Sequence, residues 1–153
     1  MKTASRTLGL VVALAAILVA IAIERSDVAA AGQTPAAADS WVRYALPGPR
    51  MPLTMRWQLL GAEGEQLVLK VDTYLDGELR STKTLKRDRI RVPEQYRMET
   101  IVAGGRKYEC KVFQLGSTTY WYSEDVPVLG IVRSQNGDHD IMELLEASAG
   151  RRQ

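Results

Sequence analysis

Apolar and polar residues alternate along two stretches of this chain, and this alternation restricts the fold more than any other feature. Residues 53–59 and 67–75 each carry a mostly apolar row at their odd positions. Successive side chains of a β-strand point to opposite faces, so a period of two predicts strands with one buried face. The dipeptide Asp76-Gly77 is typical of a tight hairpin turn, and the polar stretch 78–86 after it is expected to be an edge or solvated strand.

Turn signals divide the rest of the chain into short segments of the same kind. Strands are predicted at 98–102, 107–112 and 118–122, while Pro127 and Gly130 make 126–132 an irregular approach to a strand. The segment 141–149 has some helical spacing, but its place after the turn at 136–137 favours a strand. These features predict a mainly β fold, an antiparallel meander that forms a curved sheet or half-barrel.

The N-terminal segment predicts export from the cytoplasm. Lys2 and Arg6 precede sixteen uncharged residues, 8–23, and small residues follow. This layout fits a secretory signal peptide, or else a hydrophobic helix that stays as a membrane anchor, and both interpretations of 1–31 remain open. They place the protein in the periplasm or cell envelope. An Ala-rich flexible linker is expected at 32–40, and the antiparallel β domain at 41–150.

Composition excludes several classes of function. The chain has 20 Lys and Arg against 18 Asp and Glu, a formal net charge of +2. Neither this small charge nor the predicted location outside the cytoplasm favours nucleic acid as a partner. One His and one Cys exclude most metal clusters and any intramolecular disulfide. Cys110 lies among alternating strand residues and is expected to be a small buried hydrophobe or, as the alternative, to form a disulfide between chains. Asn136, Asp138 and Asp140 have the spacing of the first ligands in a calcium-binding loop, but the loop lacks the Gly at its sixth position and the Glu at its twelfth. We predict neither a metal nor a cofactor.

Candidates for catalysis are weak. Ser123, Asp125 and His139 are residue types of a hydrolase, but no G-x-S-x-G elbow surrounds the serine and the His follows an apparent surface turn. Glu124 and Asp125 are neighbours, and on a strand they would point to opposite faces, which does not suit paired acid–base chemistry. The sequence therefore predicts that the protein is not an enzyme.

Two groups of residues are candidates for binding. The densest basic run includes Arg87, Arg89 and Arg91, which share a face if the run is a strand; it is either a solvated face or a contact for anionic lipid headgroups. Large apolar side chains either line a groove for an apolar ligand or simply form the core. The candidates for such a groove are Trp57, Trp121, Val126 and Val132.

The order of several segments also resembles a group of uncharacterised bacterial cell-envelope proteins. The most specific part is a W-x-S-x-x-V-P-x-x-G-x-V motif, carried here by Trp121, Ser123, Val126, Pro127, Gly130 and Val132. The resemblance covers most of 41–150, but the ending ASAG replaces a more usual aromatic residue before Gly. Such domains are similar to curved sheets of the lipoprotein-localisation type, which hold lipid chains on a concave face. The resemblance thus implies the same curved-sheet fold.

Together these observations predict a non-catalytic exported protein that binds a lipid or another apolar ligand on a concave sheet face. The alternative is an envelope protein–protein interaction or structural module, and the third is an enzyme of unknown type. An apolar groove would favour the first, and an exposed apolar patch or unpaired strand edge the second.

Overall fold

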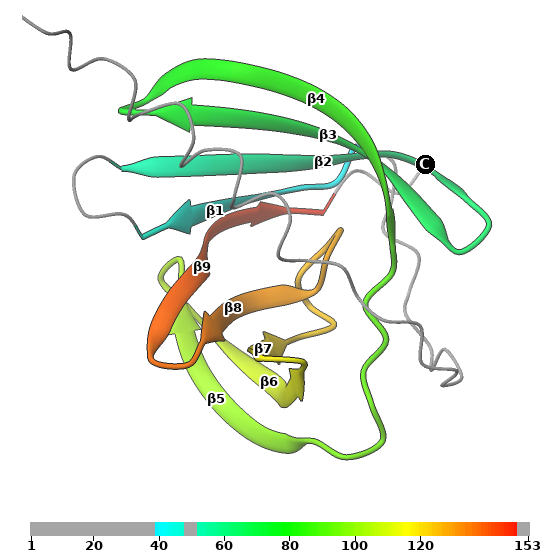
Figure 1. The fold of residues 1–153 in the computed structure, drawn as a ribbon, viewed down its shortest axis with the longest axis vertical. Coiled ribbons are helices and arrows are strands. Elements are labelled where there is room, and N and C mark those ends of the chain that lie inside the picture. The colour runs from blue at the N-terminus through cyan, green and yellow to red at the C-terminus, as the bar shows by residue number, and fades with distance from the viewer. Residues whose placement is uncertain (1–38, 48–51, 150–153) are drawn as a thin grey trace, which may run out of the picture.

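The computed structural model describes residues 39–47 and 52–149, which form one antiparallel sheet of nine strands (Figure 1). The strands are β1 (Trp41–Leu46), β2 (Leu53–Glu63), β3 (Gln66–Leu75), β4 (Glu78–Asp88), β5 (Arg97–Ala103), β6 (Arg106–Leu115), β7 (Thr118–Tyr122), β8 (Ile131–Asn136) and β9 (His139–Ser148). The predicted mainly β, antiparallel class is confirmed, and β9 confirms the strand expected near the C-terminus. The N-terminal helix, signal or anchor predicted in 1–31 lies outside the described residues, as does most of the linker.

No helix capable of crossing a membrane occurs among residues 39–47 and 52–149.

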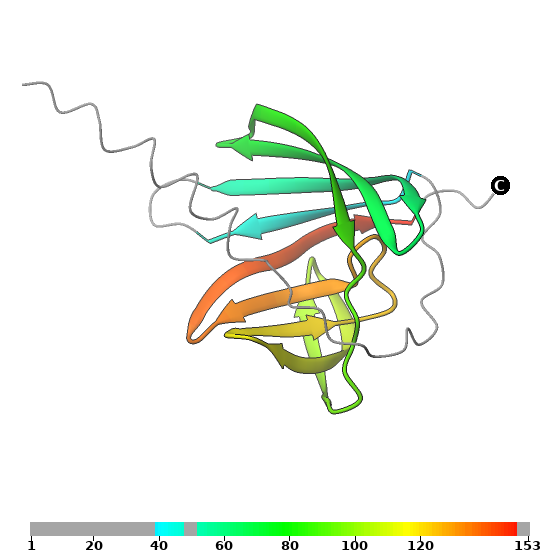
Figure 2. The same ribbon diagram turned by 45° about the vertical axis from the view of Figure 1, so that its right-hand side comes forward.

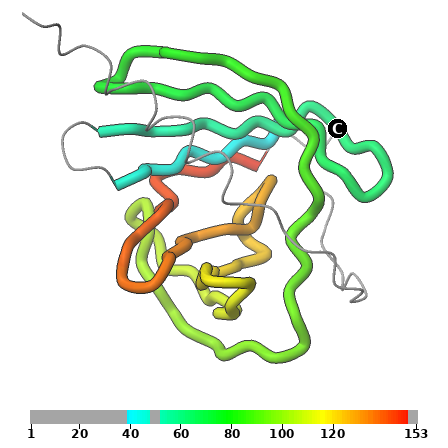
Figure 3. Tube along the Cα trace, in the orientation of Figure 1, coloured from blue at the N-terminus to red at the C-terminus, as the bar shows by residue number. Residues whose placement is uncertain are grey.

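Every strand pairs with the next one in the sequence, except that β4 does not pair with β5. Their order is β4-β3-β2-β1-β9-β8-β7-β6-β5, so the first and last strands pair in the middle and β4 and β5 are the two edges. Eight antiparallel pairings separate the edges, so β4 and β5 run in the same direction along the sheet. A tight hairpin cannot join such strands. Residues 89–96 make the connection instead, and Figure 3 traces it down one side of the molecule.

The half of the sheet from β5 to β9 curls back on itself. Gly104, directly after β5, lies so close to the backbone of Leu145 in β9 that an added Cβ would overlap the Leu145 carbonyl. These two strands are the outer members of five consecutive neighbours in the sheet. Figures 1 and 2 both show β5 curving toward β9. The curl brings distant parts of the sheet into contact.

The core lies against one face of β1–β4, which we call the core face. Val42, Tyr44 and Leu69 on this face are completely buried. The Tyr44 hydroxyl donates a hydrogen bond to the backbone carbonyl of Ile131 in β8 at 2.9 Å. Because a buried hydroxyl needs a partner, this bond fixes the Tyr44 side chain between the two halves of the sheet.

The predicted hairpin at Asp76-Gly77 is confirmed as a type I′ turn. Both residues have positive φ, 52° at Asp76 and 78° at Gly77. We expect Gly77→Val to lower the free energy of unfolding by about 1–2 kcal/mol, since a β-branched residue resists this conformation. Urea denaturation measures the effect. Gly77→Asn is the control and should stay close to the parent, because Asn tolerates positive φ; equal stability of both variants would contradict the turn assignment.

Candidate functional site

The core face continues into rows of half-buried apolar residues at one end. Strand register places Leu46 opposite Leu53, and Leu53 opposite Leu75, so these three leucines form one row across β1, β2 and β3. The adjacent row contains Met55 and Thr73 beside Tyr44. The leucines, Met55 and Thr73 are all partly accessible to solvent, whereas the rows further along are buried. This end of the core face is therefore an apolar surface that solvent reaches.

At the other end of the core face lies an arginine. Arg87 pairs in register with Leu67, which is buried, so both side chains are on the core face. The guanidinium carbon of Arg87 lies 5.6 Å from the centroid of the Trp57 ring. The structure thus brings together two residues from different predicted groups, one proposed to line a groove and the other to contact headgroups.

The charge of Arg87 has no counter-charge among the described residues. It takes part in none of the ion pairs found there. Its Nη2 and the Nε1 of Trp57 are buried, and neither nitrogen has a hydrogen-bond acceptor in the described parts of the chain. Burial lowers the pKa of Arg87, while Tyr120 and then Tyr44 act in the opposite direction. Arg87 as a whole is only half-buried, so its charge loses part of its hydration and not all of it.

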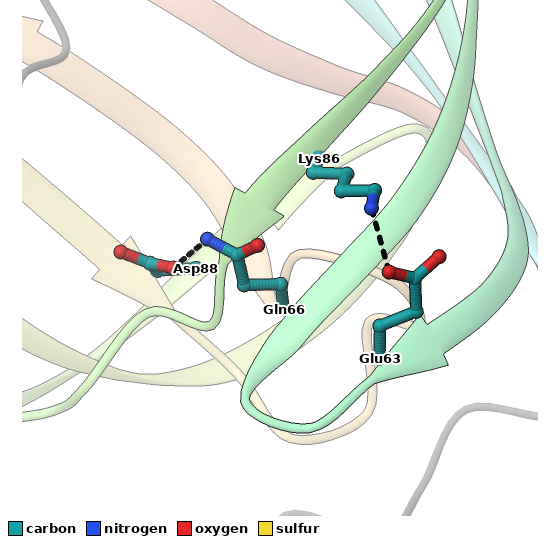
Figure 4. A network of polar contacts seen from close by, with 4 residues as sticks. All are labelled: Glu63, Gln66, Lys86 and Asp88. Carbon is teal, nitrogen blue, oxygen red and sulfur yellow. Dashed lines mark hydrogen bonds and ion pairs between the residues drawn. The ribbon is translucent and has the colours of Figure 1, made fainter.

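The residues on either side of Arg87 fix the end of β4. Lys86 Nζ lies 2.6 Å from Glu63 Oε2, and Gln66 Nε2 donates to Asp88 Oδ1 at 2.9 Å. Figure 4 shows these two contacts side by side at the β2–β3 turn. Since successive strand residues point to opposite faces, holding the two neighbours of Arg87 on the outer face directs Arg87 inward.

The basic run does not form one strand face. The expectation that Arg87, Arg89 and Arg91 share a face is wrong, because β4 ends at Asp88 and only Arg87 belongs to it. The chain must leave the sheet here to cross back to β5. Arg89 donates its backbone N–H to the Glu65 carbonyl at 3.4 Å, and Arg91 lies 3.7 Å from the Glu65 carboxylate.

The other predicted groove residues lie elsewhere in the core. Residues directly opposite each other in neighbouring strands point to the same face of the sheet. The register pairs Trp121 with Arg133, Arg133 with Glu143, and Glu143 with Ala45, so Trp121 and Ala45 share a face. Ala45 alternates with Tyr44, so Trp121 and Trp57 lie on opposite faces of the sheet. The structure therefore does not bring the two tryptophans into one groove.

The corner after β7 is closely packed. Val126 and Val132 are buried, 4% and 0% exposed. The backbone N–H of Ser123 donates to the Gly130 carbonyl at 2.8 Å, closing the corner. A Cβ on Gly130, whose φ is +70°, would overlap the ring of Tyr122. These contacts give the corner residues a packing role in the described structure.

The candidate catalytic residues are not brought together. Ser123 is buried just after β7, whereas His139 is exposed and pairs with Asn136, which is opposite Thr118 at the start of β7. The length of β7 separates them by about 16 Å at the usual strand rise. No cluster of three His, Cys, Asp or Glu residues suited to a metal ion is found within 39–47 and 52–149.

Cys110 is a free thiol in the core. It is 0% exposed, and burial raises the pKa of the thiol to about 11. A thiol with so little thiolate at neutral pH is a poor nucleophile. The expectation of a small buried hydrophobe describes it correctly.

Sequence reasoning missed Tyr44 and Tyr120, two buried tyrosines that oppose the lowering of the Arg87 pKa. Tyr44 lies in β1, where Val42, Tyr44 and Leu46 have the period-two pattern of a half-buried strand. That pattern was a usable signal. Tyr120 lies in a strand whose last three residues are all buried, so no alternation distinguishes its face.

Comparisons with known proteins add no relative. The chain matches no protein-family model, and searches of curated proteins and of solved structures found no match.

Proposed function

We propose that this protein is a non-catalytic, exported envelope protein that binds a lipid or another apolar ligand on the core face of its sheet. The observation that carries this proposal is the half-buried row of Leu46, Leu53 and Leu75, which continues the buried apolar residues of the core face toward solvent. Ligand sites are concave and mostly apolar, with a few polar groups that fix orientation. In this proposal the curved sheet acts as a half-barrel with the ligand on its concave side.

The proposed cellular location follows from the sequence. The basic residues and apolar run of 1–31 act as a signal peptide or as a helical anchor in the cytoplasmic membrane, with the β domain outside the cytoplasm. A flexible linker of 32–40 keeps an anchored domain close to the membrane surface. That location gives a lipid-binding face direct access to its ligand.

Binding of a neutral apolar probe tests the proposal. We expect N-phenyl-1-naphthylamine to gain fluorescence on the parent protein, and Leu53→Gln to weaken its binding several-fold, because the change puts an amide in the apolar row. Leu60→Gln is the matched control, since Leu60 lies on the same strand but is 48% exposed. No binding by the parent, or an equal loss in both variants at equal folded fraction, would contradict the proposed site.

One observation favours the alternative function, an envelope interaction module. The edge strand β5 and the residue just before it expose large apolar side chains: Val102 58%, Met98 59% and Tyr96 46%. Unpaired apolar edges are sites for strand addition by a partner. Photo-crosslinking in intact cells from position 98, with position 84 on the opposite edge as the control, distinguishes this function: a discrete adduct formed only at 98, without probe binding, would favour it.

A further inference from the structure

We propose that the outer face of β1–β4, opposite the core face, is a docking surface for an anionic lipid bilayer. Arg43 and Arg56 contact the lipid phosphate groups, and the rings of Trp41 and Tyr74 lie among the headgroups. This inference rests on the proposed location of the protein in the cell envelope, and not on ligand binding by the core face. It adds a second surface, the partner that the surface fits and the orientation of the domain on the membrane.

Two arginines face each other at the centre of this surface. Arg43 of β1 and Arg56 of β2 are partners in the strand register, so both side chains leave the same face of the sheet. Like charges directly opposite each other destabilise a sheet. Arg43 has the Glu146 carboxylate at 3.7 Å, but Arg56 takes part in none of the ion pairs found among the described residues. An anion bound between the two guanidinium groups would remove the repulsion and accept hydrogen bonds from both.

The carboxylate nearest to Arg56 in the register is already engaged. Asp72 of β3 lies opposite Arg56 but is only 6% exposed. It accepts a hydrogen bond from the Thr82 hydroxyl at 2.6 Å, and its other oxygen lies 3.3 Å from Lys70 Nζ. Three neighbouring rows across β1, β2 and β3 form what we call the outer patch: Ala45, Thr54 and Tyr74; Arg43, Arg56 and Asp72; Trp41, Gln58 and Lys70. Since Asp72 is buried, the charge that the outer patch presents to solvent is positive.

Each arginine of the outer patch lies over an aromatic ring. The guanidinium carbon of Arg56 is 4.6 Å from the centroid of the Trp41 ring, and that of Arg43 is 6.0 Å from the centroid of the Tyr74 ring. All four side chains are partly accessible to solvent. Stacking covers a flat face of a guanidinium group and leaves its N–H edge free for a phosphate oxygen. Trp and Tyr also favour the interface between membrane and water, because each has an apolar ring and a polar group.

The outer patch suits an extended surface more than a small enclosed ligand. The side chains of Arg43 and Lys70 are 41% and 39% exposed, so both charges reach solvent. Leu79 lies opposite Tyr74 on the edge strand β4 and is 56% exposed, which adds an apolar contact at the margin. A bilayer offers both kinds of contact, since anionic phosphates cover its apolar chains.

The sequence places the outer patch close to the proposed membrane anchor. The apolar run ends at residue 23, and 17 residues (40 minus 23) separate it from Trp41. In the anchored form proposed above, a flexible chain of this length spans roughly 20–25 Å. Docking of the domain is then intramolecular and takes place at a high effective concentration, so a few weak contacts are sufficient.

Quenching of tryptophan fluorescence by lipids that carry a nitroxide close to the headgroup tests the inference. The full chain is reconstituted into vesicles of phosphatidylcholine alone, or of phosphatidylcholine mixed with phosphatidylglycerol. Trp57 and Trp121 are only 8% and 6% exposed, so quenching that depends on docking comes from Trp41. We expect stronger quenching in the vesicles with phosphatidylglycerol. High salt and the variant Trp41→Phe should each remove that difference.

Two double variants measure the contribution of the arginine pair. Arg43→Gln with Arg56→Gln should lower the ratio of docked to undocked protein about 30-fold, or about fivefold for each arginine near an anionic surface. The control is Arg97→Gln with Arg106→Gln, which removes the same charge from exposed positions on β5 and β6 and should dock like the parent. Because all variants keep the same N-terminal segment, differences between them arise in the β domain.

The outcomes separate this inference from the proposed function. Quenching of the parent that does not depend on phosphatidylglycerol, or an equal loss in the two double variants, would overturn docking through the outer patch. A discrete protein adduct from a photo-crosslinker at position 58 in intact cells would assign the patch to a protein partner and overturn it as well. None of these results changes the binding of the neutral probe by the core face. Recovery of the chain from the cytoplasmic fraction of cells would instead remove the proposed location, and this inference with it.

Discussion

Arg87→Met is expected to raise the free energy of unfolding by about 1–3 kcal/mol. The Arg87 side chain is half-buried, its Nη2 has no acceptor and its charge no counter-ion in the described structure, and replacing a desolvated charged group by an apolar side chain of similar length can stabilise. Contact with the Trp57 ring offsets part of the cost, which limits the gain. Urea denaturation of ligand-free protein measures the change.

The control for this prediction is Arg80→Met on the same strand. Arg80 is exposed and lies 2.8 Å from Glu78, and surface pairs of this kind contribute at most about 1 kcal/mol. We expect its substitution to leave stability nearly unchanged. If Arg87→Met instead lowers the free energy of unfolding, Arg87 stabilises the folded protein, and the argument from an uncompensated charge fails.

Gly104→Ala is expected to destabilise the protein by about 2–5 kcal/mol, the sum of two effects. Gly104 has φ +54°, and an L-residue there costs about 1–2 kcal/mol. Its new Cβ would also overlap the backbone of Leu145, which cannot rotate away as a side chain can; such overpacking costs about 1–3 kcal/mol. Thermal or urea denaturation measures the loss.

Gly105→Ala separates the two effects. Gly105 is in the same turn and has φ +75°, but nothing lies within 4 Å of an added Cβ. It should therefore show only the backbone strain. If both variants lose the same stability, the close approach of β5 to β9 is not tight enough to resist a methyl group, and the curl of this half of the sheet is looser than described.

Most of the strands could be predicted from the sequence because their signals are local. Alternation within 53–59 and 67–75, and the hairpin dipeptide between 75 and 78, each depend on a few neighbouring residues. The strand β1 was not predicted as a strand in its own right. It is short, and half of its pairing is with β9, about a hundred residues away, a partnership that no local pattern encodes.

The candidate site could be predicted only in part. Arg87 and Trp57 were both singled out, but as members of different groups. Which way Arg87 points depends on where β4 ends and on which face the core lies, and both are set by long-range packing. A basic run usually indicates a solvated face, and this one does so for Arg91, whose side chain is 42% exposed. Arg87 is the exception within the run, and its inward direction is seen only in the three-dimensional structure.

The pairing of β1 with β9 has a consequence for how the domain is assembled during synthesis. The first strand to emerge keeps one edge without its partner until the last strand of the domain has also been made. Contacts between residues so distant in sequence slow folding, and an unpaired strand edge invites association with other chains in the meantime. A chain that stops before His139 would therefore lose a central strand rather than an outer one. It would be left as two separate pieces of sheet, β1–β4 and β5–β8, each with a newly exposed edge.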